Sequence, residues 1–315
     1  MASAGRRWSW DKALTGVVPP VISVINEAGV IDGEAQGSVC DHVIADGGTG
    51  LFVLGGCGEG AWLTSEQRAD VIRHAVTSAA GRAPVIAGVM LPATGPAVEA
   101  AKRAADAGAD GLVAGSPYYN HVDGDAHLRH VEAILGATPL PILLYNIPQS
   151  THHMLSIATV EALSREPRIL GIKDSSGHLD HFQGLIAIKR QVPQFRVLQG
   201  AEFAMAASAV LGGDGAVPGM GNFAPSLFRD LFAAARLGDV ARARELQAQV
   251  TALAGLHGLG GHWLPSLKGA CVLLGLGNGR PAPPLLPASG AQLSAIRACI
   301  EPNLPAHLVP RLRAA

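Results

Sequence analysis

The chain has 315 residues, of which 48 % are hydrophobic, and a formal net charge of −1. These values predict a globular protein with a large buried core. They provide neither the basic surface of a nucleic-acid-binding protein nor a charged tail. Apolar runs are too short to span a bilayer, and the N-terminal residues lack the apolar stretch of a signal peptide. We therefore expect a cytoplasmic protein.

Eight short apolar runs predict parallel strands buried on both faces, because such strands lack polar–apolar alternation. The runs cover residues 15–21, 49–55, 84–89, 111–116, 141–146, 170–175, 196–200 and 215–219. Amphipathic segments between them predict helices over 33–47, 64–79, 95–107, 125–136, 157–165, 179–190, 202–211 and 225–237. Thr64 and Gln67 form a capping-box pattern at the start of one of these helices. Eight strand–helix units favour a closed (β/α)₈ barrel, an α/β fold.

The chain continues beyond the eighth unit with three further helical segments. They cover residues 239–258, 263–276 and 289–300, and a proline-rich linker at 281–287 connects the last two. We expect a catalytic barrel over residues 12–237, a C-terminal three-helix extension over 238–302, and flexible termini at 1–11 and 303–315. The extension would cover the barrel or form a subunit contact.

Lys173 interrupts the apolar run of the sixth predicted strand, in a chain with only five lysines. An ordinary lysine reaches solvent or pairs with an acid, but a barrel strand has no solvent-facing side. Burial disfavours the ammonium form, and the resulting neutral amine can attack a ketone. An iminium formed in this way accepts electrons from a breaking C–C or C–O bond. Lys173 therefore indicates Schiff-base chemistry.

Two further features fall at predicted strand ends, where barrel enzymes place their active sites. Tyr145 ends the fifth strand, one strand before Lys173, and either moves protons or is a core tyrosine. The turn Gly55–Gly56–Cys57 follows the second strand, and its free backbone N–H groups can bind a carboxylate. The same turn is also compatible with a purely structural role, and we expect the Cys57 thiol to be inert.

No pattern in the sequence indicates a metal or nucleotide cofactor. The glycine-rich turn is not G-x-G-x-x-G followed by an acidic residue. The 12 histidines contain no H-E-x-x-H, and the four cysteines contain no C-x-x-C. We expect reduced thiols and no cofactor other than the covalent imine on lysine.

Several motifs together make the chain similar to the dihydrodipicolinate synthase / N-acetylneuraminate lyase family of class I aldolases and dehydratases. They are G-G-C-G-E at 55–59, P-Y-Y-N at 117–120, Y-N-I-P at 145–148, G-I-K-D-S-S-G at 171–177 and the glycine-rich turn at 215–222. Each motif is weak alone, but their order and spacing fit one family from about residue 16 to residue 300. The resemblance implies a (β/α)₈ barrel that binds a 2-oxo acid such as pyruvate.

The resemblance also implies roles for individual residues. Lys173 matches the Schiff-base lysine and Tyr145 the catalytic tyrosine. Tyr119 matches a tyrosine that a neighbouring subunit contributes, which implies a homotetramer built as a dimer of dimers. Val217 matches a residue whose backbone carbonyl lines the site, and Gly200 lies near the pocket.

Two positions depart from the family pattern. Gly56 stands where the family has a hydroxyl that links two tyrosines in a proton relay, so the relay here needs water, Cys57 or another group. Ser150 stands where dihydrodipicolinate synthases place an arginine that binds the aldehyde's carboxylate. With its neighbours Gln149, Thr151 and His152, it suits hydroxyl groups better than a second carboxylate.

These features support a Schiff-base lyase of 2-oxo acids, either a pyruvate-releasing aldolase or a 2-keto-3-deoxy sugar-acid dehydratase. Dihydrodipicolinate synthase itself, condensing pyruvate with aspartate semialdehyde, is an alternative that Ser150 disfavours. A non-catalytic 2-oxo-acid-binding protein on the same fold is another, suggested by Gly56 but disfavoured by the retention of Lys173 and Tyr145.

Overall fold

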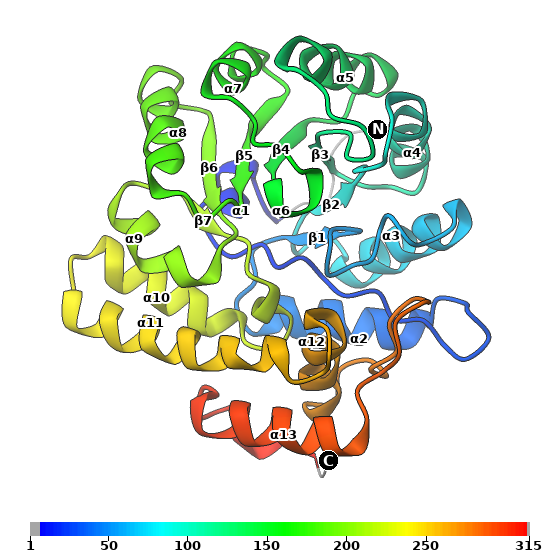
Figure 1. Ribbon diagram of the computed structural model, residues 1–315, viewed down its shortest axis with the longest axis vertical. Coiled ribbons are helices and arrows are strands. Elements are labelled where there is room, and N and C mark those ends of the chain that lie inside the picture. Colours follow the sequence, from blue (N-terminus) through cyan, green and yellow to red (C-terminus); the bar gives the residue numbers. More distant parts are fainter. Residues whose placement is uncertain (1–6, 314–315) are drawn as a thin grey trace.

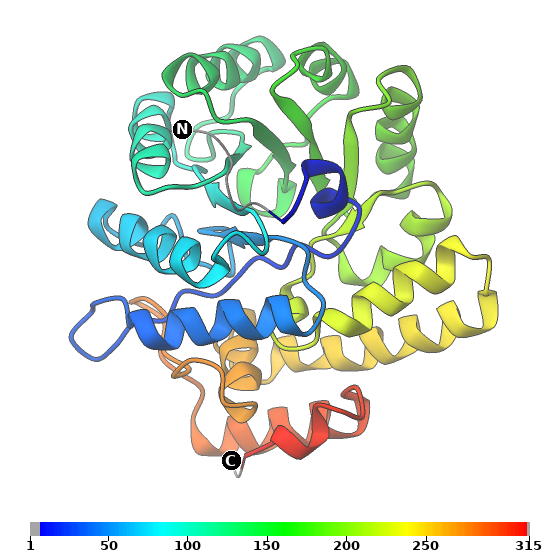
Figure 2. The same ribbon diagram turned by 180° about the vertical axis from the view of Figure 1, so that it is seen from behind.

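A computed structural model describes residues 7–313 and has the architecture of an α/β barrel (Figures 1 and 2). Seven parallel strands form one sheet in which each strand pairs with the next along the chain. The strands are β1 (Leu51–Val53), β2 (Val85–Gly88), β3 (Gly111–Gly115), β4 (Ile142–Asn146), β5 (Ile169–Asp174), β6 (Arg196–Gln199) and β7 (Gly215–Ala216). The predicted strand positions from residue 49 onward are thus confirmed.

The segment predicted as the first strand, residues 15–21, closes the barrel without forming a regular strand. It makes only isolated parallel bridges, from Val17 to Ala216 of β7 and from Pro20 to Phe52 of β1. Prolines at 19 and 20 provide no N–H group, so a continuous ladder cannot form there. The chain still bridges the two edge strands, which leaves no open sheet edge at this point.

Helices surround the sheet, as the amphipathic pattern predicts (Figure 1). They are α2 (Gly33–Ala45), α3 (Ser65–Ala79), α4 (Thr94–Asp106), α5 (Gly124–Ala137), α7 (Ile157–Ser164), α8 (Leu179–Gln191), α9 (Met205–Val210) and α10 (Pro225–Arg236). Thr64 and Gln67 form the predicted capping box of α3. The predicted helix 202–211 begins as a 3₁₀ turn, η1 (Glu202–Ala204), and short α6 (Pro148–Thr151) lies in the loop after β4.

The C-terminal extension packs along one side of the barrel, beside α10 and α2 (Figures 1 and 2). Its helices are α11 (Val240–Ala254), η3 (Gly255–Gly258), α12 (Trp263–Leu273), α13 (Gly290–Ile300), η4 (Glu301–Asn303) and η5 (Val309–Arg311). The helix predicted over 239–258 therefore ends as an α-helix at Ala254, and the helix predicted over 263–276 ends at Leu273. Residues 281–287 connect α12 to α13 without helical structure, as expected.

The end of the chain, expected to be flexible from residue 303, is packed in its described part. Leu304 and Leu308 are buried, and Arg311 Nη1 lies 2.8 Å from His42 Nδ1. Apolar burial and this contact with α2 hold the segment, so flexibility was the wrong expectation for residues 304–313. Of the N-terminal segment, residues 1–6 lie outside the described part, as do residues 314–315. The described residue Arg7 donates its backbone N–H to Gly81 at 3.0 Å.

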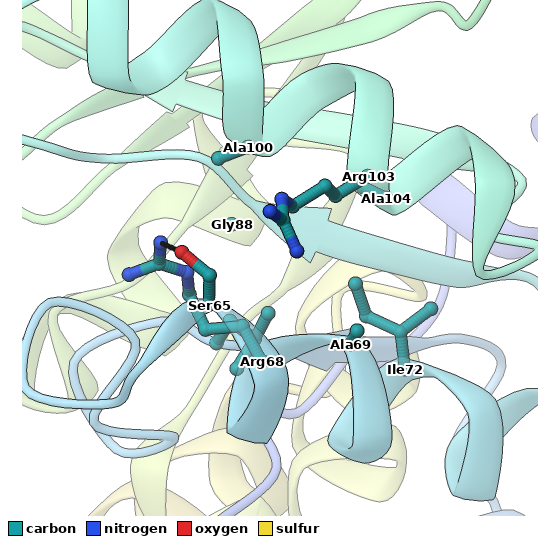
Figure 3. A pocket seen from close by; sticks show the side chains of 9 residues that line it. Ser65, Arg68, Ala69, Ile72, Gly88, Ala100, Arg103 and Ala104 are labelled. Atoms are coloured by element: carbon teal, nitrogen blue, oxygen red, sulfur yellow. Dashed lines mark hydrogen bonds between the residues drawn. The ribbon is translucent and has the colours of Figure 1, made fainter.

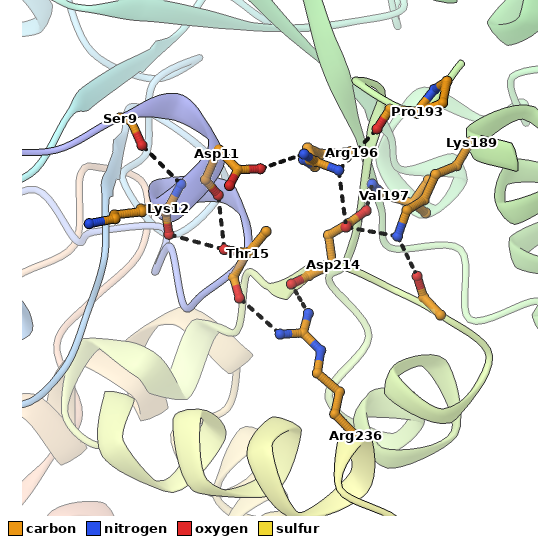
Figure 4. A network of polar contacts seen from close by, with 11 residues as sticks. Ser9, Asp11, Lys12, Thr15, Lys189, Pro193, Arg196, Val197, Asp214 and Arg236 are labelled. Atoms are coloured by element: carbon orange, nitrogen blue, oxygen red, sulfur yellow. Dashed lines mark hydrogen bonds and ion pairs between the residues drawn. The ribbon is translucent and has the colours of Figure 1, made fainter. Parts of the chain in front are cut away.

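The N-terminal end of the barrel is closed by α1 (Trp10–Leu14) and a network of charges (Figure 4). Asp214 accepts hydrogen bonds from the Val197 backbone N–H and from Lys189 Nζ, both at 2.8 Å. Arg196 joins Asp214 to Asp11 of α1. The charged side chains at this end are engaged in structural contacts with one another. We therefore expect the active site at the opposite end of the barrel. No helix within residues 7–313 is both long and apolar enough to cross a membrane.

Candidate active site

Lys173 and Tyr145 lie side by side inside the barrel, in register on β5 and β4. Lys173 Nζ is 4.2 Å from the centre of the Tyr145 ring and 5.2 Å from that of Phe52. Each of the two site residues is only 4 % exposed. Side chains alternate between the two faces of a strand, and residues paired across neighbouring strands share a face. Because Lys173 and Tyr145 are paired, both side chains face the barrel interior. The predicted proximity of these residues is confirmed.

No carboxylate of residues 7–313 forms an ion pair with Lys173 Nζ, which the two aromatic rings surround instead. Its chain neighbour Asp174 faces the other side of β5. There, Asn146 Nδ2 donates to Asp174 Oδ1 at 2.8 Å, and Ser176 Oγ donates to Asp174 Oδ2 at 3.0 Å. The lysine is therefore free of the salt bridge that would mark it as structural.

Ser175 is a site residue that the sequence interpretation missed. Its Oγ donates to Tyr145 Oη at 3.4 Å, a long hydrogen bond. Ser175 lies two residues after Lys173 and hence on the same side of the chain. This two-residue spacing was the available signal. Ser175 thus supplies a hydroxyl at Tyr145, where Gly56 supplies none.

Gly200 is needed for the packing of this group. A Cβ atom at that position would lie 2.0 Å from Ser175 Oγ and 2.7 Å from Lys173 Cε. Both distances are far below ordinary contact, so any side chain at residue 200 would displace the two groups. Gly200 therefore lies against the lysine, near the pocket as expected, but it is not on the wall of the cavity described below.

The glycine-rich turn lies at the C-terminal end of β1. Within residues 7–313, no hydrogen bond occupies the backbone N–H groups of Gly56 and Cys57. Burial raises the pKa of the Cys57 thiol to about 12, against the opposing charge of Lys173. The thiol therefore stays protonated and is a poor nucleophile. Gly55 and Gly56 reach the cavity wall, whereas Cys57 lies behind it.

A cavity of about 310 Å³ opens at the C-terminal ends of the strands. This is the end where barrel enzymes hold their substrates. Of the predicted residues, Tyr145, Gly55, Gly56 and Ser150 line it. Lys173 is not part of this wall, and its Nζ lies over the Tyr145 ring. The wall consists of Leu54, Gly55, Gly56, Glu59, Gly60, Ala61, Trp62, Met90, Gly115, Ser116, Tyr118, Tyr145, Ile147, Ser150, Thr151, His262, Trp263 and Leu264.

Three of these wall residues, His262 to Leu264, come from the C-terminal extension. No local sequence pattern indicated that the start of α12 (Trp263–Leu273) would reach the barrel mouth. A buried ion pair between Lys268 of α12 and Glu59 of the glycine-rich turn holds the two parts together. Lys268 Nζ also donates to the backbone carbonyl of Ser23 at 2.9 Å. The extension is therefore part of the site.

Val217 and Tyr119, like Lys173, Cys57 and Gly200, do not lie on the cavity wall. Val217 is buried among the barrel-interior side chains, and its backbone carbonyl accepts no hydrogen bond from the described residues. Tyr119 is 84 % exposed and does not line the cavity of its own chain, whereas Tyr118 does. The role of Tyr119 in a neighbouring subunit stays a prediction.

Two other hollows are less suited to the chemistry. One of about 10 Å³ lies between α3 and α4, where Arg68 Nη2 donates to Ser65 Oγ at 3.1 Å (Figure 3). Another of about 190 Å³ lies beside His127 and His153. No group of three or more His, Cys, Asp or Glu side chains in residues 7–313 is placed to hold a metal ion. The expectation of no cofactor stays a prediction.

Comparison with known proteins places this arrangement in a family. Residues 13–302 match the Dihydrodipicolinate synthetase family. "Probable 2-dehydro-3-deoxy-D-pentonate aldolase YjhH" of Escherichia coli K12 is 35 % identical over 281 residues, 88 % of this chain and 93 % of the relative. The 4-hydroxy-tetrahydrodipicolinate synthase of Azoarcus sp. (strain BH72) is 34 % identical over 244 residues, 78 % of this chain and 82 % of the relative.

A solved structure agrees with these relatives. The crystal structure of YagE from E. coli K12 in complex with pyruvate superimposes with a TM-score of 0.86 at 31 % identity, covering 91 % of this chain and 98 % of YagE. The barrel and its extension thus agree with the sequence relationships. The chain belongs to the dihydrodipicolinate synthetase family and is a Schiff-base-forming lyase of 2-oxo acids.

Proposed function

We propose that the chain is an aldolase that cleaves a 4-hydroxy-2-oxo acid to pyruvate and an aldehyde. The observation that carries this proposal is the buried amine of Lys173, which has no carboxylate partner within residues 7–313 and lies 4.2 Å from the Tyr145 ring centre. Two relatives at 35 % and 34 % identity bear the names of 2-dehydro-3-deoxy-pentonate and 2-dehydro-3-deoxy-gluconate aldolases. Both named substrates have the C4 hydroxyl that aldol cleavage requires.

In the proposed reaction, Lys173 Nζ attacks the C2 ketone and the carbinolamine then loses water. Tyr145 moves the protons of both steps, with the Ser175 hydroxyl as its partner in place of the hydroxyl missing at Gly56. The iminium accepts the electron pair of the C3–C4 bond, while the C4 hydroxyl loses its proton and becomes the aldehyde carbonyl. The enamine then takes a proton at C3, and hydrolysis releases pyruvate and the free lysine.

The substrate carboxylate is assigned to the glycine-rich turn. The N–H groups of Gly56 and Cys57, which form no hydrogen bond with another described residue, can donate to it, and a charged acceptor makes such hydrogen bonds stronger. Binding there places C2 toward the barrel interior, where Lys173 lies. The Val217 carbonyl, which accepts no hydrogen bond from the described residues, is assigned to the same inner end of the site.

A 4-hydroxy-tetrahydrodipicolinate synthase is the second candidate, because proteins of that name are 34 % and 36 % identical to the chain. Its aldehyde substrate carries a carboxylate. The cavity wall has Ser150 at the position of the family arginine, and no described residue of the wall is arginine or lysine. This absence of a cation favours aldol cleavage of a substrate with one carboxylate. Activity with pyruvate and aspartate semialdehyde, measured with a coupled reductase, would make the synthase the first candidate and the aldolase the second.

We infer a cytoplasmic homotetramer in which Tyr119 completes the site of a neighbouring subunit. The 84 % exposure of this tyrosine on a loop beside the cavity supports the inference. Size-exclusion chromatography with light scattering tests it, and a monomer at assay concentration would exclude the borrowed tyrosine.

Screening a panel of 4-hydroxy-2-oxo acids, with lactate dehydrogenase to detect pyruvate, tests the proposed activity. Pyruvate release by the wild type and its loss in Lys173→Ala are expected. Pyruvate binding without turnover of any panel member would support a non-catalytic 2-oxo-acid-binding protein instead. A 2-oxo acid product that keeps the full carbon chain would show a dehydratase.

A further inference from the structure

We propose that the aldehyde released from C4 carries a flat apolar group, such as an aromatic ring, which lies against Trp263 over Gly56. This inference rests on the proposed aldolase function and names the substrate class of the same site. It differs from the sequence-based expectation of a hydroxylated tail. The orientation of the side chains around the outer part of the cavity supports it.

The polar residues after Tyr145 are mostly turned away from the cavity. Gln149 Nε2 donates to the backbone carbonyls of Ser175 and Ser176, at 3.0 and 3.3 Å. Thr151 Oγ1 lies 3.0 Å from each of two backbone carbonyls, those of Ile147 and His153. Neither Gln149 nor His152 lines the cavity, and the Thr151 hydroxyl is already satisfied. The polar residues at 149, 151 and 152 therefore contribute less polar surface to the cavity than the sequence suggests.

Other polar groups of the wall are also engaged within the protein. Ser116 Oγ lies 3.1 Å from His127 Nδ1, and His262 Nδ1 accepts the Leu264 backbone N–H at 3.2 Å. The Glu59 carboxylate is paired with buried Lys268 and also accepts the Ala282 backbone N–H. Since an unengaged polar group is what a hydroxylated substrate requires, these groups are not available to a sugar chain, whereas Ser150 Oγ and Tyr118 Oη, which form no hydrogen bond within residues 7–313, are.

The outer wall is rich in large apolar and aromatic side chains. They are Leu54, Trp62, Met90, Tyr118, Ile147, Trp263 and Leu264. Trp263 remains 38 % exposed, so its ring surface is available to a ligand. Aromatic rings pack favourably against other flat groups, and burial of apolar surface supplies most of the binding energy in such pockets.

Gly56 and Trp263 are complementary. A Cβ atom at residue 56 would lie 3.9 Å from Trp263 Cη2, which is ordinary van der Waals contact. A serine or threonine, with further atoms beyond Cβ, would press against the edge of the indole. Gly56 thus keeps this edge of Trp263 clear, and the flat group is placed against the indole on its cavity side.

The position of Trp263 is fixed by the rest of α12. Lys268, one turn further along the helix, is bound by Glu59 and by the backbone carbonyls of Ser23 and Arg280. The indole is consequently held against the glycine-rich turn that binds the carboxylate. Such rigidity suits a residue that selects between substrates.

The reverse reaction gives a direct test, because it needs only pyruvate and an aldehyde. The enamine C3 forms a bond to the aldehyde carbon, the carbonyl oxygen takes a proton, and water hydrolyses the imine to the 4-hydroxy-2-oxo acid. Initial rates with benzaldehyde and with D-glyceraldehyde are measured for wild type, Trp263→Ala, Trp263→Phe and Gly56→Ser. Leu237→Ala, an exposed apolar residue outside the cavity wall, is the control for surface truncation.

We expect wild type to favour benzaldehyde in kcat/KM by about tenfold or more, the usual range for one apolar group in a fitting pocket. Trp263→Ala should lower the benzaldehyde-to-glyceraldehyde ratio about tenfold, Gly56→Ser should also lower it, and Trp263→Phe should largely preserve it. A wild-type preference for glyceraldehyde, or equal losses for both aldehydes in Trp263→Ala, would overturn the inference.

Borohydride trapping of pyruvate on the same samples separates this outcome from failure of the proposed function. A trapped imine together with a glyceraldehyde preference overturns only the aromatic substrate class. The absence of a trapped imine on wild type overturns the aldolase function and the inference with it.

Discussion

The amino group of Lys173 packs against the face of the Tyr145 ring, with Nζ 4.2 Å from the ring centre. The two residues are directly paired across neighbouring strands, β5 and β4. Their relative position is therefore set by the strand register rather than by a mobile loop, and the chemistry of the site depends on this pairing.

Replacing Tyr145 with phenylalanine keeps the ring beside Lys173 and removes only the phenolic proton. We expect kcat for pyruvate release to fall by about 10²–10⁴-fold, the usual contribution of a positioned acid–base group. Borohydride should still trap an imine, at a lower rate. Steady-state kinetics and trapping time courses check this, and wild-type kcat would mean that another group moves the protons.

Ser175→Ala tests the hydroxyl that replaces the missing relay group. Because Ser175 Oγ donates to Tyr145 Oη at 3.4 Å, we expect kcat to drop about tenfold or more. Ser176→Ala is the matched control, since Ser176 Oγ donates to Asp174 on the other side of β5. If both variants turn over like wild type, the proton path does not pass through Ser175.

Gly200→Ala adds one methyl group at the tightest point of the site. Its Cβ would lie 2.7 Å from Lys173 Cε and 2.0 Å from Ser175 Oγ, so the lysine must move. A displacement on the order of 1 Å costs about 10²-fold in rate, and we expect kcat/KM to fall by that factor. Gly136→Ala, where a Cβ meets nothing within 4 Å, should leave activity unchanged. A fully active Gly200→Ala enzyme would contradict this packing.

Lys268→Met leaves the Glu59 carboxylate buried without its partner. Removal of one member of a buried pair costs about 3–5 kcal/mol, and we expect a loss of that size in the free energy of unfolding. Adding Glu59→Gln should recover part of the loss. Urea denaturation measures both, and a single variant as stable as wild type would show that the pair does not hold the extension to the barrel.

Two buried histidines behind the cavity make stability depend on pH. Burial lowers the pKa of His127 to about 4, with smaller effects of the same sign from His130 and His153. Burial also lowers the pKa of His130 to about 4. Between pH 6.5 and about 4 the unfolded chain binds protons that the folded chain does not, so stability falls as pH falls through this window.

The expected loss is roughly 2–3 kcal/mol for each histidine over the whole window. Urea denaturation at pH 7 and pH 5 measures the upper part of this loss, and His127→Asn should show a smaller difference in the free energy of unfolding between the two pH values. The same pH difference in wild type and variant would assign the effect to other groups.

The sequence was sufficient where a local pattern decides the outcome. Eight apolar runs separated by amphipathic segments predicted the barrel, and the positions of Lys173 and Tyr145 on successive strands predicted that the two residues lie close together. The segment that contains Pro19 and Pro20 was predicted as a strand but forms only isolated bridges. Its apolar residues correctly indicated burial, but the prolines lack the N–H groups that a continuous strand pairing requires. That feature was readable in the sequence.

Contacts between distant segments could not be predicted in this way. Trp263 and Lys268 lie some 200 residues further along the chain than the glycine-rich turn that they contact. The hydrophobic periodicity of a sequence predicts helices and strands but not contacts between such distant segments. The orientation of Gln149 and Thr151 could not be predicted either, because the sequence does not show which atoms their side chains bind.

The central claim is that Lys173 forms an imine with a 2-oxo acid. Intact-protein mass spectrometry after borohydride treatment with pyruvate, on wild type beside Lys173→Ala, tests it most directly. A pyruvate-sized adduct on wild type alone is the predicted result. An adduct of equal yield on both proteins, or none on either with pyruvate and larger 2-oxo acids, would contradict the claim.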